Sequence, residues 1–255
     1  MSKTILVIPD TQTKKGVPMF HLNWLGQYIC KKQPDIILHL GDHADMESLS
    51  TYAYGKMEFE GRRYVEDIEA AKKGMNVLLD PLRALQQRQA DGKKKVYRPE
   101  MHFLLGNHEN RINRAINDDA KLSGLISTED LAYEEFGWTV HPFLKVVSLE
   151  GIAFSHYFTT GLAGRPASTA NAQLNKMHQS CVAGHQQGFQ MATGKTAEGR
   201  LLTSIIAGSF YLHDEDYLGQ QGNAHWRGAL MLHNCENGSF DLTQLPMIYL
   251  ERKYG

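Results

Sequence analysis

Five short polar clusters in this sequence combine the side-chain types that bind metal ions and move protons. Each cluster directly follows an apolar run. The clusters are Asp10-Thr11-Gln12, Gly41-Asp42-His43-Ala44-Asp45, Gly106-Asn107-His108-Glu109, Ser155-His156 and Gly184-His185-Gln186-Gln187. Open α/β sheets place their binding groups beyond the carboxyl ends of the strands. We therefore expect the five clusters to share one location.

The apolar runs ahead of the first three clusters predict strands of a parallel sheet. Thr4–Ile8, Asp35–Leu40 and Met101–Leu105 are short, apolar and β-branched or aromatic. Helix-like sequence follows the first two, from about Pro18 to Lys32 and from about Arg62 to Gln89. Two successive βα units imply a buried parallel pair.

The second half of the chain is predicted to be mainly β. Its expected strands are Lys145–Leu149, Ile152–Ser155, Cys181–Ala183, Leu201–Ala207 and Gly228–His233. The turn pairs Glu150-Gly151, Glu198-Gly199 and Asn237-Gly238 suit connections that need positive φ. A second sheet packed against the first is expected. No repeat or linker-like tract interrupts the sequence, so residues 1–255 are predicted to form a single domain.

In their order, the clusters resemble the motifs of the calcineurin-like metallophosphoesterases: DxH, GDxxD, GNH(D/E), a lone His, and GHxH. The resemblance spans residues 5 to 187. One four-residue match would be only suggestive, but five in order are specific. The resemblance implies an α/β fold of two mixed β-sheets packed as a sandwich and flanked by helices. Residues 59–64 and 134–138 also look like stand-alone phosphoesterases encoded by tailed bacteriophages.

The resemblance implies a metal-dependent phosphoric ester hydrolase with two divalent cations, which together can hold a phosphate and activate a water. One cation site would use Asp42, Asn107, His156 and His185. The other would use Asp10, Gln12, Asp42 and Gln187, with Asp42 shared between the two. For an isolated aspartate after a strand, capping of the next helix is the ordinary alternative.

Gln12 and Gln187 depart from the family, which has histidine at both positions. Two glutamines make this second site all-oxygen, which favours hard cations and predicts weaker binding. Mn²⁺ is the expected metal, with Mg²⁺, Fe²⁺, Zn²⁺ or Ni²⁺ as alternatives. A dinuclear enzyme, a mainly mononuclear one, and a degenerate site that binds without catalysis all stay open.

By the same resemblance, His108 is the general acid that protonates the leaving-group oxygen, and Asp45 orients it. Helix N-capping is the alternative role for Asp45. Arg111 and Arg114 could clamp a phosphate oxygen, or could be surface charges of a helix. Lys93-Lys94-Lys95 is interpreted mainly as a solvated loop, with substrate contact as its alternative.

The predicted function is hydrolysis of a phosphodiester or phosphomonoester, in a nucleotide or a small phosphorylated metabolite, by a metal-activated water. A DNA or RNA nuclease and a catalytically weak metal- or nucleotide-binding protein are the alternatives. The net charge of -1 gives no global attraction to nucleic acid. Three scattered cysteines fit reduced thiols, and no leader or membrane-length apolar stretch is present. We expect a soluble cytoplasmic protein, in the host cytoplasm if a phage encodes it.

Overall fold

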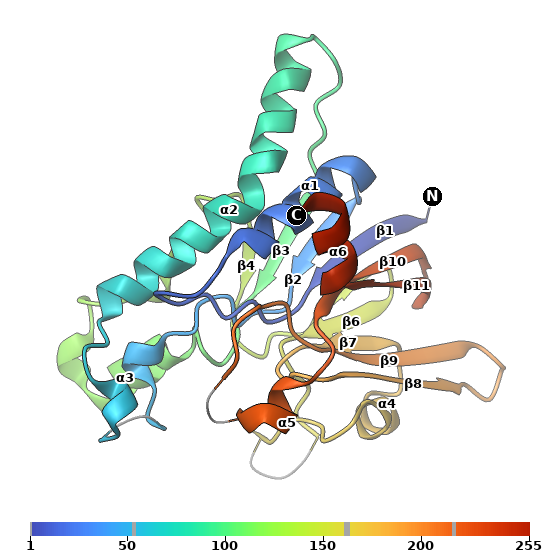
Figure 1. Ribbon diagram of the computed structural model, residues 1–255. Helices are drawn as coiled ribbons and strands as arrows, with labels where there is room; N and C mark the ends of the chain where they lie inside the picture. The colour runs from blue at the N-terminus through green and yellow to red at the C-terminus, as the bar shows by residue number, and fades with distance from the viewer. Residues whose placement is uncertain (1, 53–54, 161–163, 216–217) are drawn as a thin grey trace.

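The computed structural model describes residues 2–52, 55–160, 164–215 and 218–255, and its elements form two mixed sheets with helices on their outer faces (Figure 1). The first sheet has the order β11-β10-β1-β2-β3-β4. Its strands are β1 Lys3–Ile8, β2 Ile36–His39, β3 Glu100–Leu104, β4 Thr139–His141, β10 Gly228–Glu236 and β11 Ser239–Pro246. β1 to β4 are parallel, whereas β10 and β11 are antiparallel additions.

The second sheet has the order β5-β6-β7-β9-β8. Its strands are β5 Val147–Leu149, β6 Ile152–Ser155, β7 Cys181–Ala183, β8 Phe189–Lys195 and β9 Leu201–Ala207. β6, β7 and β9 are parallel, and the outer strands β5 and β8 are antiparallel to their neighbours. The loops that follow the parallel strands of the two sheets can therefore meet at one end of the molecule.

The helices are α1 Phe20–Lys32, α2 Tyr64–Asp91, α3 Arg111–Asp118, α4 Ala170–Met177, α5 Gly219–Asn223 and α6 Met247–Tyr254. α1 packs between α2 and α6, and α4 packs on β8 and β9. α2 is amphipathic over its first two thirds and then extends beyond the body of the protein (Figure 1). No helix in the described ranges combines the length and apolarity needed to cross a bilayer.

Strand alternation divides the core into two layers. Ile5 and Val7 of β1 join the cluster between the sheets, which contains Phe154 and Ile205 of the second sheet. Leu6 and Ile8 point the other way and contribute to the helix-side cluster. This period of two is what a strand buried on both faces requires.

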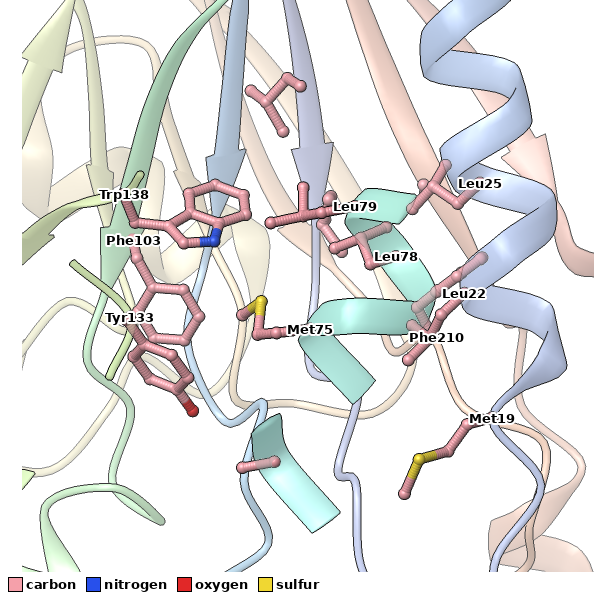
Figure 2. Packing of buried hydrophobic residues seen from close by; sticks show 14 of the residues in the cluster. Met19, Leu22, Leu25, Met75, Leu78, Leu79, Phe103, Tyr133, Trp138 and Phe210 are labelled. Atoms are coloured by element: carbon pink, nitrogen blue, oxygen red, sulfur yellow. The ribbon is translucent and has the colours of Figure 1, made fainter. Parts of the chain in front are cut away.

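The helix-side layer packs α1 and α2 onto the first sheet. Figure 2 shows Leu22 and Leu25 of α1 beside Leu78 and Leu79 of α2. The aromatic side chains in the same view lie on the side of α2 away from α1, and they are Phe103, Tyr133 and Trp138. Gly26 makes this close packing feasible, because a Cβ there would collide with the Leu78 carbonyl oxygen. The layer fixes the start of α2 beside the loops that carry the polar clusters.

The predicted fold class is confirmed, and the structure adds elements that the sequence did not reveal. The first helix begins at Phe20 rather than Pro18, and the second spans Tyr64–Asp91 rather than Arg62–Gln89. All five strands predicted in the second half are present, with bounds shifted for β5 and β10. β4, β8 and β11, and the helices α4, α5 and α6, were not predicted.

Candidate metal centre

The five polar clusters converge at one end of the sandwich, as their position after parallel strands predicted. The backbone N–H groups of Thr11 and Gln12 donate to the Asp42 carbonyl oxygen at 3.1 and 2.9 Å. The N–H of His108 donates to Asp42 Oδ1 at 2.8 Å, and that of His185 donates to Asp10 Oδ1 at 3.1 Å. The loops after β1, β2, β3 and β7 are therefore joined directly to one another.

Four side chains form the first group of candidate ligands. Asn107 Oδ1 lies 2.9 Å from His156 Nε2 and 2.7 Å from His185 Nδ1. Asp42 Oδ2 lies 3.4 Å from His156 Nε2. One atom each from Asp42, His156 and His185 lie within 4.8 Å of one another, close enough to share one ion. The four residues follow four different strands, two in each sheet.

The ring of His156 is oriented with Nε2 toward this group. Its Nδ1 donates to the Leu40 carbonyl oxygen at 2.8 Å, which fixes the Nδ1–H tautomer of a neutral ring. Nε2 of that ring then presents a lone pair to the oxygens of Asn107 and Asp42, which are acceptors as well. The arrangement is favourable only with a positive charge among these atoms, carried by a proton or by a metal ion.

Three oxygens make up a second group of candidate ligands. Asp10 Oδ2, Gln12 Oε1 and Gln187 Oε1 are all buried, and none has a hydrogen-bond partner among the described residues. A buried acceptor without a partner costs about 1–3 kcal/mol. Carboxylate and amide oxygens are ligands that divalent cations accept, so the chemistry of these three residues fits the metal that the resemblance implies.

The pKa values of the two buried aspartates, Asp10 and Asp42, are shifted in opposite directions. Burial, reinforced by the charge of Asp42, raises the pKa of Asp10 to about 7. Burial also opposes ionisation of Asp42, but His108 and His156 outweigh it and hold the pKa of Asp42 well below its usual range. Burial lowers the pKa of His156, yet the Asp42 charge raises it overall to about 9. The site as a whole favours added positive charge.

Strained backbone and close contacts coincide at the candidate ligands. Gln12, Asp42 and His185 have φ values of 39°, 50° and 68°, in the left-handed region that such residues seldom adopt. A Cβ at Gly106 would collide with the Asp42 carboxylate, and one at Gly184 would lie 2.7 Å from Asp10 Oδ1. The two motif glycines therefore leave room for the two aspartates.

His108 lies beside the first group and is held by three neighbours. Its Nδ1 is 2.9 Å from Asp45 Oδ1, and its Nε2 is 3.1 Å from an Arg111 guanidinium nitrogen and 3.8 Å from Asp42 Oδ2. Burial lowers the pKa of His108, but the Asp42 charge exceeds that effect and the net shift is upward. The contact between His108 and Asp45 is the one that the sequence predicted.

The two predicted arginines have different positions. Arg111 donates to the carbonyl oxygens of Asp45 and Met46 at 2.7 and 3.3 Å and lines a cleft of about 620 Å³. Arg114 is exposed and is not one of the residues that line this cleft. The cleft reaches Asn107, His108 and His185 at its base. Arg111 is therefore placed to meet a ligand of the cleft.

Glu109 has a role that the sequence did not reveal. Its carboxylate is fully buried and accepts five hydrogen bonds. The donors are the backbone N–H groups of Asp42, His43, Ala44 and Gly106, at 2.7 to 2.9 Å, and the hydroxyl of Tyr133, at 3.3 Å. Glu109 thus binds the loop of Asp42 to the loop of Asn107.

Lys14 also escaped the sequence analysis. Its ammonium lies 3.1 Å from Asp45, 3.3 Å from Glu47 and 2.8 Å from Glu215, in a position only 11% exposed. These carboxylates come from two loops far apart in the sequence. Lys14 therefore balances negative charge on the wall of the cleft, and it holds Asp45, the partner of His108, in place.

A buried chain of hydrogen bonds supports the same loops from below. Thr11 Oγ1 lies 3.2 Å from His39 Nε2 and 2.6 Å from His43 Nδ1, and His43 Nε2 donates to the Ala71 carbonyl oxygen at 2.9 Å. Burial lowers the pKa of His43 to about 4, so its ring is neutral. The contacts of His39 and His43 tie the first two loops to α2.

The protein has an α/β fold of two mixed sheets flanked by helices, with loop motifs that resemble those of the calcineurin-like metallophosphoesterases. No protein-family model matches the chain. The Gene 54 protein of Mycobacterium phage D29 is 30% identical over 263 residues, covering 97% of this chain and 95% of that protein. The chain therefore belongs to the family of this phage protein. The Gene 54 protein of Mycobacterium phage L5 is 27% identical over 245 residues, covering 91% of this chain and 89% of that protein.

Two solved structures also align with this chain over most of its length. Vps29 from Entamoeba histolytica, complexed with Zn²⁺, is 11% identical, covers 96% of this chain and 99% of its own, and has a TM-score of 0.38. A dimetal phosphatase from Danio rerio is 10% identical, covers 96% of both chains, and has a TM-score of 0.47.

Proposed function

We propose that this protein is a metal-dependent phosphoesterase. The observation that carries the proposal is a nitrogen and oxygen cluster around Asn107 Oδ1, with three buried oxygens without partners on the loops joined to it. The motif order that predicted these groups supports the same reading. Phosphoesterases use such paired sites to hold a phosphate between two cations.

In this proposal Asp42, Asn107, His156 and His185 hold one divalent cation, and Asp10, Gln12, Asp42 and Gln187 hold the other. The first set mixes nitrogen and oxygen donors, whereas the second is all oxygen, so Mn²⁺, which accepts both kinds, is the proposed metal. When bound, the cations polarise the phosphate and lower the pKa of a water molecule.

The protein's own groups position the substrate and supply a proton. His108 holds a proton at Nε2 for the leaving-group oxygen, while Asp45 fixes the ring through Nδ1. In this structure the Arg111 guanidinium donates to Nε2, so Arg111 must turn from Nε2 to a phosphate oxygen before Nε2 can carry that proton. Arg114 stays a predicted substrate contact that would require movement toward the cleft.

The cleft favours a small phosphorylated substrate, such as a nucleotide, over a nucleic-acid strand. Its volume of about 620 Å³ is in the usual range for small-ligand sites. Two of its cations are already paired with acids, Lys14 with three carboxylates and Arg62 with Glu47 at 3.3 Å. A nuclease groove would instead present unpaired cations along the phosphate track.

The test is hydrolysis of a phosphodiester and a phosphomonoester by metal-stripped protein supplied with Mn²⁺, Mg²⁺, Zn²⁺ or no metal. Asp42→Asn should abolish both turnover and calorimetric metal binding. His108→Ala should keep metal binding and lower turnover by roughly 100- to 10,000-fold for esters with poor leaving groups. The loss should be smaller for p-nitrophenyl esters, whose leaving group needs little protonation.

The exposed His178, changed to Asn, is the matched control and should leave turnover unaltered. Tight metal binding without turnover on any ester would reject the enzyme in favour of a binding role. Metal-independent turnover would reject the proposed mechanism.

A further inference from the structure

The far end of α2 and the segment after it form a strongly basic projection. We define the basic arm as residues 83–99, which contain six arginines and lysines and a single carboxylate, Asp91. The arm carries a net charge of +5 in a protein whose total is -1. It extends past the body at the end opposite the lower loops (Figure 1).

Hydrogen bonds hold the arm in a defined shape. The N–H of Lys94 donates to the Gln89 carbonyl oxygen at 2.8 Å, which places the lysines directly at the end of α2. Tyr97 is held by Gln86 and Gln89 at 3.0 and 2.8 Å. Its hydroxyl donates to the Pro34 carbonyl oxygen at 2.6 Å, next to the last turn of α1. The cations are therefore presented on a fixed scaffold.

Most of these cations are not neutralised. Within the described parts of the chain, Arg88, Lys93, Lys94, Lys95 and Arg98 are exposed and form no ion pair with a carboxylate. The exposed Lys31 and Lys32, in the last turn of α1, extend the same surface. This contrasts with Lys14 and Arg62 of the cleft, which have acidic partners.

The composition of the arm identifies the kind of partner. None of the exposed large apolar side chains in the described residues lies within 83–99. Protein interfaces depend on such anchors, and membrane-binding helices insert them. A phosphate backbone requires only charge and hydrogen-bond donors, which the arginines, lysines and glutamines supply. We propose that the basic arm binds the phosphate backbone of nucleic acid.

This binding surface is separate from the metal centre. His43, in the loop of Asp42, contacts α2 at Ala71, and the helix continues for about 20 residues to Asp91. At 1.5 Å per residue, the arm begins about 18 Å along the helix from Ala71, and the helix ends about 30 Å from it, next to the lysines. The proposal therefore does not rest on the phosphoesterase assignment. Nucleic acid on the arm would hold the protein in place and leave the cleft free.

The experiment measures binding of a fluorescein-labelled duplex of about 30 base pairs by anisotropy, in EDTA so that no metal contributes. The duplex is roughly 100 Å long at 3.4 Å per base pair. The test variant is Lys93→Gln/Lys94→Gln/Lys95→Gln. The matched control is Lys145→Gln/Lys176→Gln/Lys195→Gln, which removes the same charge from exposed positions elsewhere.

For the unaltered protein, five phosphate contacts give a slope of log K against log salt of about -4.5, and the test variant should fall to about -1.8. Its affinity at about 50 mM salt should drop at least about tenfold, while the control keeps the original affinity and slope. Absence of salt-dependent binding, or equal weakening in both variants, would overturn the proposal. Binding to phosphatidylserine vesicles at least as tight as to the duplex would overturn it too.

Discussion

Replacing Glu109 with glutamine should destabilise the protein strongly while leaving its volume unchanged. Each carboxylate oxygen of Glu109 accepts two backbone N–H groups, from His43 and Ala44 on one side and from Asp42 and Gly106 on the other. A glutamine keeps only one acceptor oxygen. Its NH₂ group must face the other pair of donors, so two buried N–H groups lose their partners.

The magnitude follows from those two groups. An unpaired buried donor costs about 1–3 kcal/mol, so Glu109→Gln should lower the free energy of unfolding by about 2–6 kcal/mol. The loss falls on the contact between the Asp42 and Asn107 loops, so metal affinity should fall as well. Urea denaturation gives the first quantity, and calorimetric metal titration gives the second.

Glu135→Gln is the matched control, because Glu135 is exposed and two residues from Tyr133. It should leave both quantities within about 0.5 kcal/mol of the unaltered protein. A Glu109→Gln protein as stable as this control, with unaltered metal affinity, would refute the idea that the carboxylate joins the two loops.

Three further outcomes are expected. Lys14→Met should lower the free energy of unfolding by about 3–5 kcal/mol, because it leaves three carboxylates without their shared cation. Lys14→Arg keeps a cation there and should retain part of that stability, as thermal denaturation of the two variants would show. Gln12→His with Gln187→His should shift calorimetric preference toward Zn²⁺, since imidazole replaces carbonyl oxygen; an unchanged order of metals would contradict the assigned ligands. Burial lowers the pKa of His21 to about 3, so the folded state resists its protonation, and stability should fall as pH drops below about 6.5. Between pH 6.5 and 5 the loss is about 2 kcal/mol, and urea titrations of His21→Leu should show a correspondingly shallower dependence.

The sequence predicted that the candidate ligands lie together, because their positions depend on local chain structure. Asp10, Asp42 and Asn107 each follow a buried parallel strand, and the structure brings them together with His156 and His185. Their roles as ligands stay predictions. The strands with continuous apolar runs were equally evident, since a strand buried on both faces leaves that pattern.

The supporting contacts could not be read from the sequence. Lys14 meets Glu215 across 201 positions, and nothing local specifies that pairing. Glu109 was visible as part of a motif, but its bonds to backbone groups do not depend on neighbouring side-chain types. β8 was missed because Phe189–Lys195 contains a glycine and few β-branched residues, so its pairing with β9 stabilises it more than its own composition does.

The candidate ligands are spread along the chain from Asp10 to Gln187, and this spacing constrains the order of events during synthesis. A growing chain that has reached residue 150 contains Asp42 and Asn107 but neither His156 nor His185. Neither ligand group can close until β7 has paired with β6, a late and long-range event in folding. In the proposed metal centre, uptake of either ion must therefore follow the pairing of β6 with β7, and a chain that ends before His185 lacks ligands of both groups.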